Sequence, residues 1–309
     1  MHRYLAQHPE IFMSRRKEPR YFARDLDAGN EWEAHYFTRN LDEYLANFAD
    51  AGDAKVIGES STWYVYSPTA PELIRDFSPD ARVMIMLRNP VHLTHARHQQ
   101  SVWSGRENIV DFAEALAAEA DRREGRRLPH QPVHVRGLQY RAASTMTPLV
   151  RRYLDLFGPE RVLVVLLEEM ARDTIGVYRR VLDFLGVDPN FVPSDMGVAN
   201  ASRSPRNARL RRSLLRFRGL RDRAKKALPR PLQRVIALPL KLRRLNQRRA
   251  PRAAMSRELE LQLTHEFAPD VAALSNLLGR DLTASWPQFR DVATPPVIPA
   301  AGDRSMEPT

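Results

Sequence analysis

The sequence has no cysteine among its 309 residues, and this absence excludes a disulfide framework, a thiolate metal site and a cysteine nucleophile. It also lacks any run of 18 apolar residues, so we expect no membrane-spanning helix. The stretch up to Pro19 has neither the apolar centre nor the small-residue cleavage site of a signal peptide, and we therefore predict a cytoplasmic location. With 43% hydrophobic and 28% charged residues, the composition is that of a folded chain of one large or two small domains.

Positive charge is in excess, at +11 overall, but it is concentrated in one segment. Residues 203–252 contain 19 Lys and Arg and a single acid, Asp222, so this segment carries +18 and the other residues carry the difference, −7. Leucines recur among its arginines at helical spacing, which predicts short amphipathic helices. Such helices can form a solvated cover packed on the body, a contact with the anionic inner membrane surface, or a groove for an anionic polymer. Aromatic residues are sparse there, so nucleic acid is the least favoured partner.

Apolar runs and helical patterns alternate along the rest of the chain. We expect strands at 55–58, 82–87 and 161–167, and helices at 3–7, 68–77, 90–103, 147–157, 174–185 and 256–278. Continuously apolar strands separated by helices are typical of a parallel sheet that is covered on both faces. The sequence therefore predicts an α/β fold of three layers, with a central parallel sheet flanked by helices.

Parallel sheets bind ligands at the carboxyl ends of their strands, so the residues that follow each strand are candidates for a site. The strand at 55–58 is followed by Glu59, Ser61 and Tyr64, and the strand at 82–87 by Arg88. Arg88 precedes the start of a helix, where a guanidinium group and unpaired N–H groups together suit a phosphate.

A compact group of a base, an acid and two aromatic residues, KEPRYF, lies before the first of these strands. Its Glu18 is either half of an ordinary ion pair or a functional carboxylate. Three histidines, His92, His95 and His98, recur at every third position of the helix expected at 90–103. On a helix they spread over about 120°, which is too wide for one metal ion, although one or two of them can line a site.

Six segments, in this order, resemble the sulfotransferases that use 3′-phosphoadenosine 5′-phosphosulfate (PAPS), above all their bacterial and Golgi-type carbohydrate branch. The segments are KEPRYF, GESSTWYVYSPTAPELIRDFSPDARVMIMLRNPV, YLDLFGPERVLVVLLEEM, VYRRVLDFLGV, NASRSPRNARL and VAALSNLLGRDLTASW. The resemblance covers about residues 1–290. It implies a P-loop-NTPase-like sulfotransferase fold, and transfer of a sulfuryl group to a hydroxyl or amine without a metal ion.

The resemblance also implies roles for single residues. Glu18 matches the general base of the carbohydrate branch, and a positioned carboxylate can accept the proton of an attacking hydroxyl. Arg88 matches the arginine that binds the 3′-phosphate of the donor, and the loop with Arg203 and Arg206 is expected at the same donor site. The residues expected to line the substrate site are Lys17, Arg20, Glu59, Ser61 and Tyr64.

Two features depart from the family pattern. Leu93 and Ala96 stand where the family usually has a second arginine and a serine for the 3′-phosphate, so His95, Arg97 or the Arg203/Arg206 loop would have to supply those contacts. The chain also begins inside the first helix of the family, without the first strand and the phosphosulfate-binding loop. We expect a start codon assigned too far downstream to be the reason.

The first hypothesis is therefore a PAPS-dependent sulfotransferase that acts on a carbohydrate or glycolipid. The rival hypothesis is a non-catalytic relative that binds a glycan or an anionic membrane through its basic segment. The expected organisation is a sulfotransferase core at 1–200, a basic amphipathic segment at 201–252, a C-terminal helical part of the same domain at 253–290 and a disordered tail at 291–309.

Overall fold

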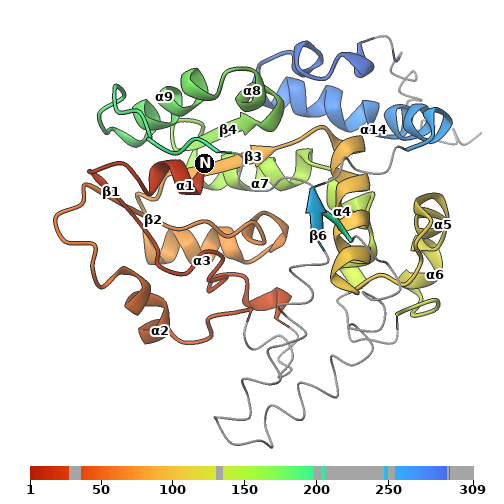
Figure 1. Cartoon of the computed structure of the whole chain (residues 1–309), viewed down its shortest axis with the longest axis horizontal. Coiled ribbons are helices and arrows are strands. Elements are labelled where there is room, and N and C mark those ends of the chain that lie inside the picture. The colour runs from red at the N-terminus through yellow and green to blue at the C-terminus, as the bar shows by residue number, and fades with distance from the viewer. Residues whose placement is uncertain are drawn as a thin grey trace, which may run out of the picture.

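The computed structural model of the chain describes residues 1–27, 36–129, 135–197, 203–205, 247–249, 255–290 and 292. Two pairs of parallel strands lie at its centre (Figure 1). β1 (Ile11–Met13) pairs with β2 (Val56–Gly58), and β3 (Val83–Leu87) pairs with β4 (Val162–Leu166). Among the described strands, neither pair is hydrogen-bonded to the other. The predicted α/β class, with parallel strands between helices, is confirmed.

Ten α-helices of the described part surround these strands. The longer ones are α3 (Ala70–Phe77), α4 (Pro90–Ser104), α7 (Thr147–Phe157), α9 (Thr174–Leu185) and α14 (Arg257–Leu278). The shorter ones are α1 (His2–Leu5), α2 (Leu41–Leu45), α5 (Phe112–Ala117), α6 (Glu119–Arg123) and α8 (Leu167–Arg172). Ser256 starts α14 by accepting a hydrogen bond from the Leu259 N–H at 3.2 Å, and Gly279 ends it in the left-handed conformation at φ 60°.

The β3–β4 pair is covered on both faces because successive side chains of a strand point to opposite sides. Ile85 and Val164 lie in a cluster with apolar side chains of α4, α7 and α14. Met84 and Val165 lie in a second cluster with side chains of α1, α8 and α9. Figure 1 shows α8 and α9 on one side of the strands and α7 on the other. This layering leaves the carboxyl ends of the strands open for a site.

Most helix ends agree with the sequence-based expectation, but three points differ. The helix expected from Pro68 begins at Ala70, with Pro71 in its first turn, and the Ser67 hydroxyl accepts from the Ala70 N–H at 2.9 Å. The strand β1 was not expected, since three residues give too short a pattern. In the basic segment, β5 (Arg203–Pro205) and β6 (Gln247–Arg249) form an antiparallel pair, while the amphipathic helices expected between them lie outside the described residues.

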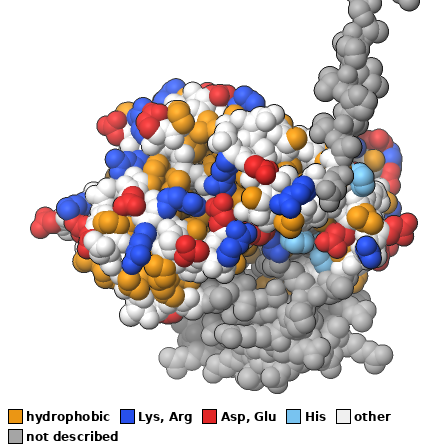
Figure 2. Space-filling model, turned by 90° about the horizontal axis from the view of Figure 1, so that it is seen from above, with side chains coloured by type: hydrophobic (Ala, Val, Ile, Leu, Met, Phe, Trp, Pro, Cys, Tyr) orange, Lys and Arg blue, Asp and Glu red, His pale blue; other side chains and the backbone are white. Residues whose placement is uncertain are grey.

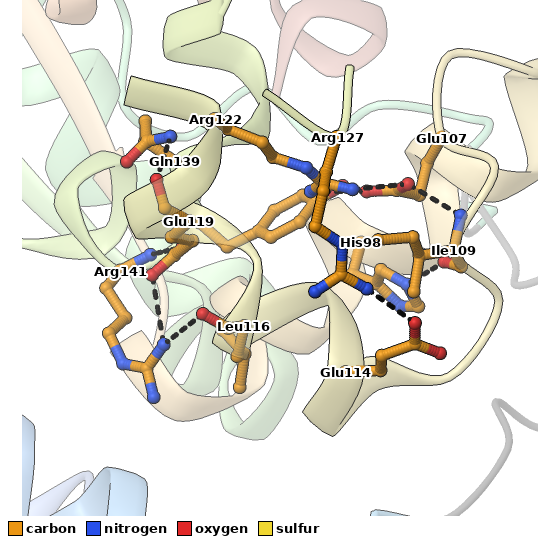
Figure 3. A network of polar contacts seen from close by, with 11 residues as sticks. His98, Glu107, Ile109, Glu114, Leu116, Glu119, Arg122, Arg127, Gln139 and Arg141 are labelled. Carbon is orange, nitrogen blue, oxygen red and sulfur yellow. Dashed lines mark hydrogen bonds and ion pairs between the residues drawn. The ribbon is translucent and has the colours of Figure 1, made fainter. Parts of the chain in front are cut away.

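A buried ion pair fixes the α5–α6 region beside α4 (Figure 3). The side chains of Arg122 and Glu107 are both fully buried, with Nη1 and Oε2 2.8 Å apart. The Tyr140 hydroxyl donates to the same carboxylate at 2.7 Å, and so does the Ile109 N–H at 2.8 Å. His98 of α4 joins the network through its Nε2, 2.9 Å from the Ile109 carbonyl oxygen. Because buried charges are stable only with such partners, this network ties three chain segments together.

On the surface, basic and acidic side chains are interspersed over the face of the described residues that Figure 2 shows. This distribution agrees with the charge count, which assigns the positive excess to residues 203–252. No helix in the part of the chain that the structure describes is both long enough and apolar enough to cross a membrane.

Candidate active site

A cavity of about 2870 Å³ opens at the carboxyl ends of β2 and β3 and continues between the two strand pairs. Such a volume exceeds the roughly 300–1,000 Å³ of a pocket for one small ligand, because the cavity includes the space between the two strand pairs. The wall includes five of the residues predicted from the sequence: Lys17, Glu59, Ser61, Tyr64 and Arg88. The strand ends therefore converge as expected for a parallel sheet.

Glu59, directly after β2, is the centre of a hydrogen-bonded group in this wall. Its carboxylate accepts from the hydroxyls of Tyr64 at 2.5 Å, Ser61 at 2.7 Å and Tyr44 at 3.2 Å. Burial is the main cause that raises the pKa of Glu59, and the three donors oppose it only in part. The Ser61 hydroxyl in turn accepts from the Arg20 N–H at 3.1 Å. Glu59 thus positions the segment after β2 and the segment around Arg20 relative to each other.

Glu18 lies against the same wall without being part of the cavity lining itself. Its carboxylate accepts from the Thr62 N–H at 3.1 Å and from the Thr62 hydroxyl at 3.1 Å and 3.2 Å. Its own N–H donates to the Ser60 carbonyl at 3.0 Å. Thr62 does line the cavity, and the Glu18 side chain is 21% exposed. The carboxylate is therefore held in a fixed orientation at the edge of the cavity.

The backbone on both sides of Pro19 is strained. Glu18 and Arg20 have φ values of 61° and 58°, in the left-handed region that side-chain-bearing residues rarely adopt. Such conformations cost on the order of 1–3 kcal/mol each and concentrate at functional sites. Here the hydrogen bonds from Glu18 and Arg20 to the segment after β2 stabilise the strained turn.

The Arg20 guanidinium lies among aromatic rings, with its central carbon 4.7 Å from the Trp63 ring centre and 5.7 Å from the Tyr36 and Phe37 ring centres. Its Nε lies 3.5 Å from a Glu18 oxygen, so the ion pair that the sequence left as an alternative is present. Burial is the main cause that lowers the pKa of Arg20, and the Glu18 charge opposes this effect. Arg20, like Glu18, is outside the cavity lining.

The start of α4, next to Arg88, differs from the sequence-based expectation in one respect. The side chain of Asn89 caps α4 by accepting from the Val91 N–H at 3.0 Å and the His92 N–H at 3.3 Å. Those two N–H groups, which we expected to be unpaired, are therefore already engaged. Glu168 accepts from the Asn89 N–H at 3.1 Å and fixes this turn further. An anion at Arg88 would depend on the guanidinium group more than on the helix end.

Two of the three α4 histidines share an environment, against the ring of Phe112. His95 and His98 both line the cavity, whereas His92 Nε2 is 3.7 Å from Glu260 Oε1. Within the described ranges, no three His, Asp or Glu side chains gather as a metal site would require.

The remaining predictions have mixed outcomes. Leu93, Ala96 and Arg97 line the cavity, and the contacts expected there for a 3′-phosphate stay a prediction. Arg203 is described only as backbone, and Arg206 lies outside the described residues, so their role stays a prediction. The sequence-based prediction did not include Thr62. Its place in the same strand-end segment as Glu59 and Ser61 is the feature that could have indicated it.

Basic side chains outnumber acidic ones in the described cavity wall. Its lining contains eight Lys and Arg against three Asp and Glu. The cations are Arg3, Lys17, Lys55, Arg82, Arg88, Arg97, Arg106 and Arg136, and the acids are Glu59, Asp80 and Asp111. A cavity lined in this way favours ligands that carry several negative charges.

Comparison with known proteins gives consistent results. No family model matches the chain. The chain is similar to the crystal structure of a sulfotransferase from Alicyclobacillus acidocaldarius, with 30% identity and a TM-score of 0.65 over 92% of each chain.

Two curated proteins are similar over shorter stretches. The membrane-associated sulfotransferase kil1 of Dictyostelium discoideum is 30% identical over 100 residues, which are 32% of this chain and 19% of that protein. The heparan sulfate glucosamine 3-O-sulfotransferase 6 of Mus musculus is 28% identical over 189 residues, 60% of this chain and 47% of that protein. The matched stretches thus span less than half of either curated relative.

Proposed function

Because this chain belongs to the sulfotransferase family, we propose that it transfers a sulfuryl group from PAPS to a hydroxyl, or an amine, of a carbohydrate or glycolipid. The observation that carries this proposal is the cavity at the ends of β2 and β3, whose wall contains strand-end residues that the family pattern singles out. The positive lining fits the donor, which carries a phosphosulfate and a separate 3′-phosphate. The similarity to a heparan sulfate sulfotransferase supports a carbohydrate acceptor.

In the proposed reaction the oxygen of the acceptor hydroxyl forms a bond to the sulfur of the donor, and the bond between that sulfur and the 5′-phosphate oxygen breaks. The hydroxyl proton passes to the Glu18 carboxylate, which acts as general base. The products are the sulfated acceptor and 3′-phosphoadenosine 5′-phosphate. Negative charge builds up on the departing phosphate and the transferred oxygens, and cations of the cavity wall stabilise it.

Separate residues serve the two ligands in this proposal. Arg88 holds the 3′-phosphate of the donor through its guanidinium fork, and the Arg203/Arg206 loop belongs to the same donor site. On the acceptor side, Lys17 lies in the cavity wall, and Glu59 holds Ser61 and Tyr64 in place. Peripheral contact with an anionic membrane through residues 203–252 remains part of the proposal.

Calorimetry with 3′-phosphoadenosine 5′-phosphate, together with transfer of labelled sulfate from PAPS to a panel of glycans and glycolipids, tests the proposal. We expect micromolar binding of the nucleotide and label in at least one acceptor. Arg88→Gln should weaken that binding at least tenfold. Adenosine 5′-monophosphate, which lacks the 3′-phosphate, is the comparison ligand, and its binding should not change. Arg151→Gln, an exposed position on α7 outside the cavity, is the matched control. Neither nucleotide binding nor label transfer in the wild-type protein would favour the non-catalytic alternative.

A further inference from the structure

Among the cations that line the described cavity wall, Arg97 alone has a buried polar atom, its Nε, without a hydrogen-bond partner. Its side chain forms no ion pair within the described residues, whereas Arg3 and Lys55 are neutralised by Asp195 and Glu10. The guanidinium carbon of Arg97 lies 4.6 Å from the centre of the Tyr66 ring. A cation that is partly withdrawn from water and lacks a counter-charge is costly unless a ligand supplies one.

The position of Arg97 places it where ligands of this fold bind. It lies one helical turn after Leu93 on α4, so both side chains are on the face of the helix that lines the cavity. Long helical side chains lean toward the helix N-terminus, which directs Arg97 back over Leu93. Tyr66 belongs to the segment after β2, whereas α4 follows β3. The contact between Arg97 and Tyr66 therefore joins the carboxyl ends of the two strands across the cavity.

The arrangement also suits the chemistry of an anion. A guanidinium group that lies on an aromatic face keeps its in-plane N–H groups for a second partner. Those N–H groups match the paired oxygens of a phosphate, sulfate or carboxylate group. Tyr66 holds the group in place and reduces the freedom that would be lost on binding.

We propose that Arg97, held against the ring of Tyr66, forms an oxyanion-binding subsite in the cavity and acts in addition to Arg88. The group that it binds is a phosphate, sulfate or carboxylate of one of the two substrates. It is either the 3′-phosphate of the donor or an anionic substituent of the acceptor. The identity of the ligands rests on the proposed function, whereas the presence of the anion subsite does not.

Two matched pairs of variants test the subsite. Arg97→Gln removes the charge, and Arg151→Gln makes the same change at the exposed α7 position. Tyr66→Leu removes the ring, and Tyr66→Phe keeps it. The first probe is inorganic sulfate, measured as the rise in the temperature of unfolding. We expect the rise to be smaller in Arg97→Gln and Tyr66→Leu, and to stay at the wild-type level in Arg151→Gln and Tyr66→Phe.

Further measurements identify the source of the anion. If it is the donor, Arg97→Gln weakens binding of 3′-phosphoadenosine 5′-phosphate at least tenfold and leaves binding of adenosine 5′-monophosphate unchanged. If it is the acceptor, nucleotide binding stays the same, while KM rises at least tenfold for a sulfated glycosaminoglycan oligosaccharide and not for an uncharged chitin oligosaccharide.

The inference is overturned if Arg97→Gln equals Arg151→Gln with sulfate, with both nucleotides and with both glycans. Failure of the proposed function has a different signature, because a wild-type protein without nucleotide binding or transfer still responds to sulfate if the subsite exists. Circular dichroism confirms that each variant is folded, and Arg97→Lys provides a second variant that keeps the charge without the planar fork.

Discussion

The carboxylate of Glu18 is held by Thr62 through two donors at once, the backbone N–H and the hydroxyl, at distances of 3.1–3.2 Å. The two residues are 44 positions apart in the chain, so the contact connects the strained turn around Pro19 to the segment after β2. Both carboxylate oxygens are engaged, which restricts rotation of the side chain. A general base needs such a fixed orientation, because proton transfer depends first on geometry.

The first prediction concerns the role of Glu18 itself. Glu18→Gln keeps the shape of the side chain and an oxygen that can accept from Thr62, but it removes the proton acceptor. We expect the rate of sulfuryl transfer to fall about 100-fold or more, in the range typical of a lost general base. Binding of 3′-phosphoadenosine 5′-phosphate and the unfolding midpoint in urea should change little. Near-normal turnover of Glu18→Gln would remove this residue from the mechanism.

Thr62 is predicted to be a positioning residue that acts through Glu18. Thr62→Val keeps the size and the backbone N–H and removes only the hydroxyl. A hydrogen bond to a charged group contributes about 1.5–3 kcal/mol, so we expect kcat to fall about tenfold or more. KM for the donor should change little, because the hydroxyl acts on the orientation of Glu18 and not on donor binding.

The control for this prediction is Thr62→Ser, which restores the hydroxyl and should restore kcat. A purely structural role of Thr62 would lower stability and reduce kcat and donor binding together. That outcome would contradict the assignment.

The extent to which the sequence predicts this structure depends on how local each feature is. The helices α7 and α9 have the predicted ends, because their apolar periodicity runs to Gly158 and Gly186, which stop them. The strands β3 and β4 were equally clear as apolar, β-branched runs. The strand β1 has three residues and forms by pairing with β2, far along the chain. Its pattern is too short to identify without that partner.

The candidate site likewise combines features that the sequence predicts with features that depend on residues far apart in the chain. The rule that ligands bind at strand ends, together with the family resemblance, brought Glu59, Ser61 and Arg88 to one cavity wall. That rule could not predict the contact between Thr62 and Glu18. The contact depends on a left-handed backbone at Glu18, a conformation that glutamate rarely adopts. The rule also does not account for the start of α4, where the Asn89 side chain accepts from two of the N–H groups expected to be unpaired.

Glu59 predicts a specific pH dependence of stability. Its folded-state pKa is raised, mainly by burial, so its contribution to stability is complete below the ordinary glutamate pKa of about 4.3 and is lost as the pH rises through the folded value. Glu59→Gln cannot ionise and still offers an oxygen to Tyr64 and Tyr44. We therefore expect the free energy of unfolding of the wild type to fall relative to this variant between pH 5 and pH 8.

Urea unfolding at the two pH values measures this difference, with Glu72→Gln at an exposed position of α3 as the control. Each unit of pKa shift corresponds to about 1.4 kcal/mol, so a shift of one unit is within the reach of the method. A constant difference between wild type and Glu59→Gln at both pH values would show that Glu59 ionises as freely in the folded chain as in the unfolded one.

The buried pair of Glu107 and Arg122 should dominate the stability of the α5–α6 region. Arg122→Met keeps the length of the side chain but leaves the Glu107 carboxylate buried with only the Tyr140 and Ile109 donors. Breaking one partner of a buried pair costs about 3–5 kcal/mol. The exposed ion pairs of Arg126 with Glu124 and Asp121 are the matched comparison, and Arg126→Met should cost much less than Arg122→Met.

The same pair predicts how acid unfolds the chain. Burial alone would raise the pKa of Glu107, but Arg122, Tyr140 and the Ile109 N–H together hold it below its ordinary value. Its contribution is therefore present above the ordinary glutamate pKa and is lost as the pH falls through the lower, folded value.

In the double variant Glu107→Gln with Arg122→Met, neither member of the buried pair carries a charge. The cost of the double variant should therefore be smaller than that of Arg122→Met alone. Its stability should also fall less steeply below pH 4.5 than that of the wild type. Equal acid dependence in the two proteins would mean that other carboxylates control acid unfolding.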